Sequence, residues 1–159
     1  MEAAPADVRT FTPSPFANGK VALPAASALF WERLRPLLPP GYTDRAGTRW
    51  RFVGVSKYIM FASFRPGDAF GMHTDTGAEW DDAARRYSKH TVLLYLNDDF
   101  RGGRTAFFDH GFAPTCTVTP RRGSLLAFDI DLYHSGEPVV DGGSKLWIGT
   151  ELVCERELP

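Results

Sequence analysis

From residue 48 onward, the sequence consists of short apolar runs of strand length separated by clusters of Gly, Pro and Asp. The runs cover residues 49–55, 57–64, 69–75, 90–97, 104–109, 115–120, 123–130, 132–140 and 145–153. Eight or nine short strands with hairpin-sized gaps predict two antiparallel sheets packed as a jelly roll or a small barrel. The runs TVLLYL and SLLAF are continuously apolar, which is typical of strands buried on both faces.

One helix is predicted ahead of these strands. In the segment LPAASALFWERLRPLL, Leu29, Phe30, Trp31 and Leu34 recur at helical spacing, and Pro24 suits a first helical turn. Prolines at 36, 39 and 40 end the pattern, and we expect the helix to cover one face of a sheet. The 159 residues suit one domain, with an N-terminal extension and supporting helix over 1–47 and a mainly β jelly-roll core over 48–156.

Composition narrows the classes of partner. The net charge of −1 provides no basic surface for nucleic acid or for an anionic membrane, so neither partner is predicted. The two cysteines fit neither a metal-binding pair nor a disulfide scaffold, and we expect both to be small buried hydrophobes. Without a signal-peptide core or an 18-residue apolar run, a cytoplasmic protein is expected. The oligomeric state is left open.

The connection between Asp75 and His90 is longer than the others. Its fourteen residues, TGAEWDDAARRYSK, exceed what a compact domain usually needs. Two interpretations stay open: a lid beside a functional site, or a solvated loop or single short helix.

His73 and Asp75 form the first candidate site. If this segment is a strand, residues two apart share a face, about 7 Å apart at Cα, and both could bind one metal ion. The spacing alone is weak evidence, and His134, some sixty residues later, is the candidate third ligand. Two imidazoles and one carboxylate suit non-haem Fe(II), because they leave three positions open. A structural zinc site would require a fourth protein ligand, and neither cysteine is placed to supply it.

Lys145 enters an otherwise apolar strand. A buried ammonium requires an anionic partner, although the strand's solvent end is an equally good position for a lysine. His90 and His110 open a strand and lie in a turn, respectively, so we expect surface or turn histidines rather than ligands. Glu151 would share a face with Lys145 and Trp147 in a regular strand, which raises the hypothesis that it orients a cationic substrate.

The order of these elements resembles the Fe(II)/2-oxoglutarate-dependent dioxygenases, and within them the prolyl 4-hydroxylase-like branch. The segments FRPGDAFGMHTD, TVLLYLNDDFRGGRTAFF, VTPRRGSLLAF and HSGEPVVDGGSKLWI resemble that branch's motifs in the right order, over about residues 50–153. The resemblance implies a double-stranded β-helix, a distorted, cupin-like jelly roll.

Carried over residue by residue, the resemblance implies that His73, Asp75 and His134 are the catalytic iron ligands. Lys145 would pair with the far carboxylate of 2-oxoglutarate, and the Tyr95 hydroxyl would donate to the same carboxylate. Other expected co-substrate residues are Thr91 and Leu93, which share the strand face of Tyr95, together with Phe64 and Trp147. Three features depart from the family pattern: Phe64 replaces a common tyrosine, Gly149 replaces an arginine found in some relatives, and the His-to-Lys spacing is one residue longer.

The implied activity uses Fe(II), 2-oxoglutarate and O2 to hydroxylate an aliphatic C–H, with release of succinate and CO2. Carboxylate ligation by Asp75 favours hydroxylation over halogenation, and ascorbate is expected to stimulate turnover. The substrate, a peptide (prolyl peptides included) or a small molecule, stays open because fold analogy does not choose between them. The alternative is a non-catalytic cupin-like metal- or ligand-binding module, which would not require Lys145 and Tyr95.

Overall fold

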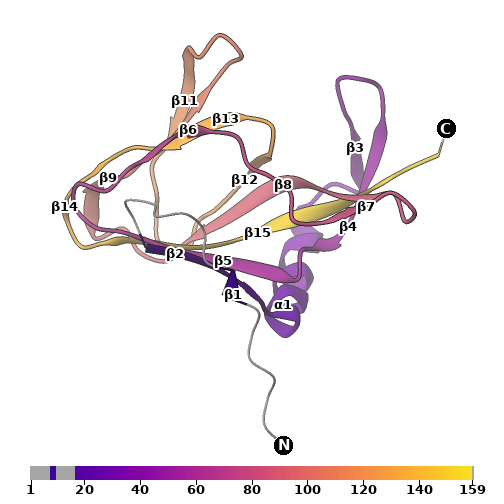
Figure 1. Ribbon diagram of the computed structural model, residues 1–159, viewed down its shortest axis with the longest axis horizontal. Coiled ribbons are helices and arrows are strands. Elements are labelled where there is room, and N and C mark those ends of the chain that lie inside the picture. The colour runs from indigo at the N-terminus through magenta and orange to yellow at the C-terminus, as the bar shows by residue number, and fades with distance from the viewer. Residues whose placement is uncertain (1–7, 10–16, 159) are drawn as a thin grey trace, which may run out of the picture.

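The computed structural model describes residues 8–9 and 17–158 (Figure 1). Within these residues the chain forms one α-helix, one short 3-10 helix and fifteen strands. The helices are α1 (Pro24–Leu34) and η1 (Arg35–Leu37). The strands are β1 (Val8–Arg9), β2 (Ala17–Ala22), β3 (Gly41–Thr43), β4 (Arg49–Val55), β5 (Tyr58–Phe64), β6 (Phe70–His73), β7 (Trp80–Asp81), β8 (Arg86–Tyr95), β9 (Phe100–Gly102), β10 (Thr105–Phe108), β11 (Pro114–Val118), β12 (Leu125–Asp129), β13 (Tyr133–Gly136), β14 (Val139–Gly142) and β15 (Lys145–Arg156).

The larger sheet has nine strands and is organised around β15. Along one edge β15 pairs with β8, and along the other it pairs first with β5 and then with β4. β2 extends the sheet beyond β5, and β12 extends it beyond β8. All of these pairings are antiparallel, so side chains on the same face can be followed from strand to strand through the register.

A smaller sheet, in the order β11-β10-β13-β6, lies opposite the larger one (Figure 1). A separate pair, β14 and β9, lies at one end of the two sheets in the same view. Two facing antiparallel sheets confirm the prediction of a mainly β jelly roll. The space between them contains the candidate site.

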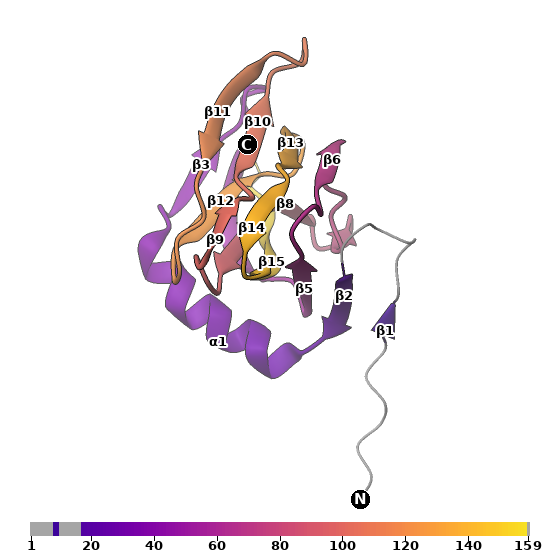
Figure 2. The same cartoon turned by 90° about the vertical axis from the view of Figure 1, so that its left-hand side faces the viewer.

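The predicted helix is confirmed, and it covers the outer face of the larger sheet (Figure 2). Pro24 begins α1, where its missing N–H costs no helical hydrogen bond. Leu34 packs with Val92 of β8 and Leu152 of β15, and all three are almost fully buried. Because Val92 faces the helix, its neighbours Thr91 and Leu93 face the opposite sheet. Packing of α1 therefore determines which side chains of β8 reach the site.

The prediction of a long connection before His90 is wrong. β8 begins at Arg86, four residues earlier, and Trp80 and Asp81 pair with Tyr87 and Arg86 to form a hairpin. The structure therefore has neither the fourteen-residue loop nor a single short helix in this segment. Charged residues in RYSK concealed the strand, because edge hairpins at the surface lack a continuous apolar run.

Three smaller expectations also fail, two of them at a sheet edge. Cys116 is exposed in β11 at the edge of the smaller sheet, whereas Cys154 is buried as expected. The run SLLAF is not buried on both faces, since Leu125 is 41% exposed in β12, an edge strand. The run 132–140 divides into β13 and β14. Among the described residues, no helix is long and apolar enough to cross a membrane.

Candidate active site

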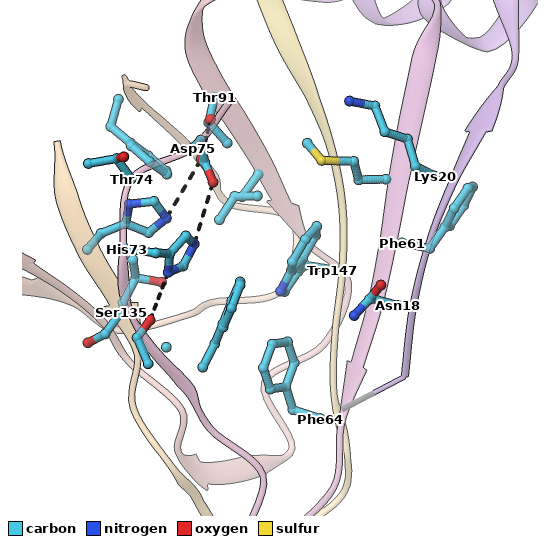
Figure 3. Close-up of a pocket in the computed structure, with 18 of the residues that line it drawn as sticks. Asn18, Lys20, Phe61, Phe64, His73, Thr74, Asp75, Thr91, Ser135 and Trp147 are labelled. Carbon is cyan, nitrogen blue, oxygen red and sulfur yellow. Dashed lines mark hydrogen bonds and ion pairs between the residues drawn. The ribbon is translucent and has the colours of Figure 1, made fainter. Parts of the chain in front are cut away.

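Strand pairing brings the two predicted histidine ligands together. His73 of β6 lies directly opposite His134 of β13 in the antiparallel register. Asp75 follows β6 by two residues, and its backbone N–H donates to the Ile130 carbonyl at 2.9 Å, which holds the chain at this point. One possible ligand atom from each of the three side chains lies within 4.8 Å of the other two (Figure 3). We call these residues the His73–Asp75–His134 cluster.

Both imidazoles are oriented by the backbone. The Nδ1 atom of His73 lies 2.8 Å from the Gly71 carbonyl, and that of His134 lies 3.0 Å from the Leu132 carbonyl. A carbonyl only accepts hydrogen bonds, so Nδ1 carries a proton in each ring, and in the neutral form of each ring Nε2 keeps a free lone pair. The Nε2 atoms lie 3.5 and 3.7 Å from the two carboxylate oxygens of Asp75.

The electrostatic environment favours the ligand forms of His134 and Asp75, but the protonated form of His73. Burial lowers the pKa of His134, more than the nearby Asp75 charge raises it, so the neutral imidazole is favoured. Burial opposes ionisation of Asp75, but hydrogen bonds with His73 and Thr91 and the charge of His134 lower its pKa overall. For His73, burial is outweighed by hydrogen bonds with Asp75 and Gly71, so its pKa is raised.

The donor set fits Fe(II). It offers two imidazole nitrogens and a carboxylate, and no fourth His, Cys, Asp or Glu joins the cluster among the described residues. Three ligands with further positions open are typical of non-haem Fe(II) sites, whereas structural zinc sites are closed by a fourth ligand. His90 packs against Tyr42 and Phe52 away from the cluster, and His110 packs near Tyr133.

A cavity of about 560 Å³ opens beside the cluster. Its walls are largely apolar, with few polar groups, as in most small-molecule sites. The sequence-predicted residues that line it are Phe64, His73, Asp75, Thr91, Leu93, His134, Lys145, Trp147 and Glu151. Tyr95 is 1% exposed and lies behind this wall.

Lys145 is buried in the cavity wall and is only 3% exposed. The alternative prediction, a lysine at the solvent end of the strand, is therefore wrong. Its Nζ donates to the Gly103 carbonyl at 2.7 Å and lies 5.2 and 5.6 Å from the ring centroids of Phe64 and Tyr95. Within the described part of the chain, no carboxylate forms an ion pair with it. Burial lowers the pKa of Lys145 to about 8, although the Glu137 charge opposes this.

Two hydroxyl hydrogen bonds organise the cavity wall. Thr91 donates to Asp75 Oδ2 at 2.5 Å and thereby holds the carboxylate of the cluster. The Tyr95 hydroxyl is 2.8 Å from Oγ1 of Thr105, and Thr105 itself lines the cavity. Thr105 was missed in the sequence, because its position depends on the pairing of β10 with β13, which no local pattern reveals.

Glu151 shares the inner face of β15 with Lys145 and Trp147, as a regular strand predicts. Its carboxylate already has a cation, since Lys20 of β2 lies 3.3 Å from Oε1. The Ala78 N–H and the Ser88 hydroxyl both donate to Oε2 at 2.6 Å. The idea that Glu151 alone orients a cationic substrate overlooked Lys20, which lies before the predicted core.

Part of the sequence matches known proteins. A family model described as the 2OG-Fe(II) oxygenase superfamily matches residues 55–150. Human prolyl 3-hydroxylase 3 is 45% identical over 56 residues, which are 34% of this chain and 8% of that protein, so this chain spans a small part of that relative.

Solved structures resemble the fold. A prolyl hydroxylase from Trichoplax adhaerens, in complex with a hypoxia-inducible factor peptide, has a TM-score of 0.56 at 18% identity, covering 86% of this chain and 62% of that one. A prolyl 4-hydroxylase from Pseudomonas putida has a TM-score of 0.47 at 23% identity, covering 64% and 53%.

Proposed function

The chain belongs to the 2OG-Fe(II) oxygenase superfamily, as its motifs predict, and from this membership we propose that it is an Fe(II)- and 2-oxoglutarate-dependent hydroxylase. Its substrate would be an aliphatic C–H of a peptide, prolyl peptides included, or of a small molecule. The observation that carries the proposal is Lys145, a buried ammonium without a carboxylate partner among the described residues, in the cavity of the His73–Asp75–His134 cluster. A simple metal-binding module has no use for such a cation.

In this proposal, each charged centre has one task. His73, Asp75 and His134 hold Fe(II) through Nε2, a carboxylate oxygen and Nε2, and Thr91 keeps the carboxylate oriented. Lys145 pairs with the far carboxylate of 2-oxoglutarate, which would supply the missing anion. Gly103 leaves room for the Lys145 side chain: its φ is +61°, and a Cβ there would lie 3.2 Å from the Lys145 Cδ.

The remaining residues shape the pocket. Tyr95 and Thr105 provide a hydroxyl pair at the co-substrate wall, and Leu93 and Trp147 exclude water from the reacting groups. When bound, iron with 2-oxoglutarate and O2 supplies the oxidation, in which one oxygen atom enters the substrate C–H and the other enters succinate as CO2 leaves. Stimulation by ascorbate and organisation as a single domain over 1–159 stay predictions.

Turnover of 2-oxoglutarate tests the proposal. Purified protein is supplied with Fe(II), 2-oxoglutarate and air, and succinate is measured against 2-oxoglutarate consumed. We expect equal amounts, with loss of activity in His73→Ala. Metal binding without any succinate would contradict the hydroxylase and would match a cupin-like binding module.

A further inference from the structure

The segment matched by the family model does not include every residue of the cavity wall. The matched segment, 55–150, contains the His73–Asp75–His134 cluster and Lys145. Four cavity-lining residues lie outside that segment: Asn18, Gly19, Lys20 and Glu151. Residues shared with the family serve the common chemistry, so this additional part of the wall is where the chain can select its own substrate.

The register places this part of the wall on the same floor as the co-substrate residues. Asn18 of β2 pairs with Ala62 of β5, and Ala62 pairs with Trp147 of β15. Two residues along β2, Lys20 pairs with Met60 of β5. Paired residues share a face, so the side chains of Asn18 and Lys20 continue the floor of the cavity onto β2. Figure 3 shows both side chains across the cavity from His73 and Asp75.

The hydrogen-bonding capacity of this surface is only partly used. Lys20 has three N–H donors and one carboxylate partner, Glu151, and the two side chains are 15% and 4% exposed. Glu151 Oε2 accepts two hydrogen bonds, but among residues 8–9 and 17–158 Oε1 accepts only from Lys20. The exposed Asn18 amide has no side-chain partner within the described residues. The surface therefore offers both donors and acceptors.

The charges on this surface cancel. Lys20 and Glu151 form a pair, so neither a free carboxylate nor a free ammonium gains much by binding here. A neutral group with one acceptor and one donor, such as a backbone amide, matches the unused capacity of the pair. Asn18 offers the same combination one strand repeat away, about 7 Å along β2, and an extended peptide repeats its amides at this spacing.

We propose that Asn18 and the Lys20–Glu151 pair form a subsite for the backbone of an extended peptide substrate. The inference rests on the proposed function and deepens it: the hydroxylated molecule is a peptide, not a free small molecule. Met60, which pairs with Lys20 and lines the cavity wall, supplies apolar contact for the side chains of the peptide.

The experiment uses the Fe(II)-loaded full chain with two probes. One is a pool of N-acetylated, C-amidated pentapeptides randomised at every position, and the other is a pool of free amino acids. Succinate release above the rate without a probe is measured. We expect the peptide pool to raise the rate severalfold and the free amino acids to leave it unchanged.

Variants then locate the effect. Asn18→Ala and Lys20→Met are each expected to raise the KM for the pool roughly three- to tenfold, as the loss of one hydrogen bond implies, with kcat near wild type. Lys57→Met is the matched control, because its ammonium also lies 5.3 Å from the Tyr58 ring but outside the cavity wall; its KM should not change. Asn18→Ala decides the question if Lys20→Met fails to fold, since Asn18 is exposed.

The two levels of the proposal fail differently. Succinate release without peptide stimulation, or a wild-type KM in Asn18→Ala, would overturn the peptide subsite and leave the hydroxylase intact. Absence of succinate under every condition would overturn the hydroxylase, and the subsite with it.

Discussion

Replacing Lys145 with Met should separate stability from co-substrate binding. The ammonium is 3% exposed, and the charge has no carboxylate partner in the described part of the chain. Burial lowers the pKa of Lys145 from 10.5 to about 8. At 1.36 kcal/mol per pKa unit, the folded protein holds the proton about 3 kcal/mol less favourably than the unfolded chain does.

The sign of the pH dependence follows from the two pKa values. Between pH 8 and 10.5, the unfolded chain keeps the proton and the folded protein loses it, so stability rises with pH. The destabilisation is fully present below pH 8 and fades as the pH approaches 10.5. We therefore expect the free energy of unfolding of wild type, relative to Lys145→Met, to rise by about 2 kcal/mol between pH 7 and pH 10.

Lys145→Met removes a destabilising buried charge from the protein, but it should weaken the binding of 2-oxoglutarate. Removing one partner of a buried charge pair costs about 2–5 kcal/mol, so the Kd for 2-oxoglutarate should rise at least about 30-fold. Urea denaturation of the metal-free protein at both pH values and calorimetric titration of 2-oxoglutarate into the Fe(II) protein measure the two effects. An unfolding free energy with the same pH dependence in both proteins, or an unchanged Kd, would refute this account of Lys145.

Two further variants test the site and the scaffold separately. Thr91→Val removes the hydrogen bond to Asp75 and should weaken Fe(II) binding about 10- to 100-fold in a metal titration. The control is Thr150→Val, at a buried threonine that donates to the Tyr58 carbonyl, and it should leave Fe(II) binding unchanged. Equal Fe(II) affinities in the two variants would contradict the role of Thr91. Leu34→Ala should lower the free energy of unfolding by about 2–5 kcal/mol, because Leu34 is buried against the sheet. Leu29→Ala, at a residue that is 55% exposed on the same helix, should change it by less than about 0.5 kcal/mol. Similar losses in the two variants would mean that α1 is not packed as described.

Local patterns pointed to several residues that line the cavity, and the family resemblance connected them. Lys145, Trp147 and Glu151 alternate along one regular strand, so period two alone placed them on one face. His73 and Asp75 were proposed from their spacing of two residues, although β6 ends at His73 and a backbone hydrogen bond to Ile130 holds Asp75 beyond it. The helix was equally predictable, because its prolines and apolar spacing are local signals. Strand β4 also matches the predicted run 49–55.

Features that depend on strand partners were not predictable. Lys20 lies in ANGKVA, a short strand with only one large apolar residue, and only its pairing with β5 brings it to Glu151. The exposure of Cys116 follows from the edge position of β11, which the run TCTVTP does not show. Register and edge position are properties of the assembled sheet, so they escape a residue-by-residue reading.

The central claim is that the His73–Asp75–His134 cluster and Lys145 together hold Fe(II) and 2-oxoglutarate in one cavity. Anaerobic addition of 2-oxoglutarate to the Fe(II) protein tests it most directly, through the weak visible charge-transfer band expected when the two bind each other. We predict a band that saturates at one 2-oxoglutarate per chain in wild type and is absent in His134→Ala. No band in wild type, or a band of equal intensity in His134→Ala, would contradict the claim.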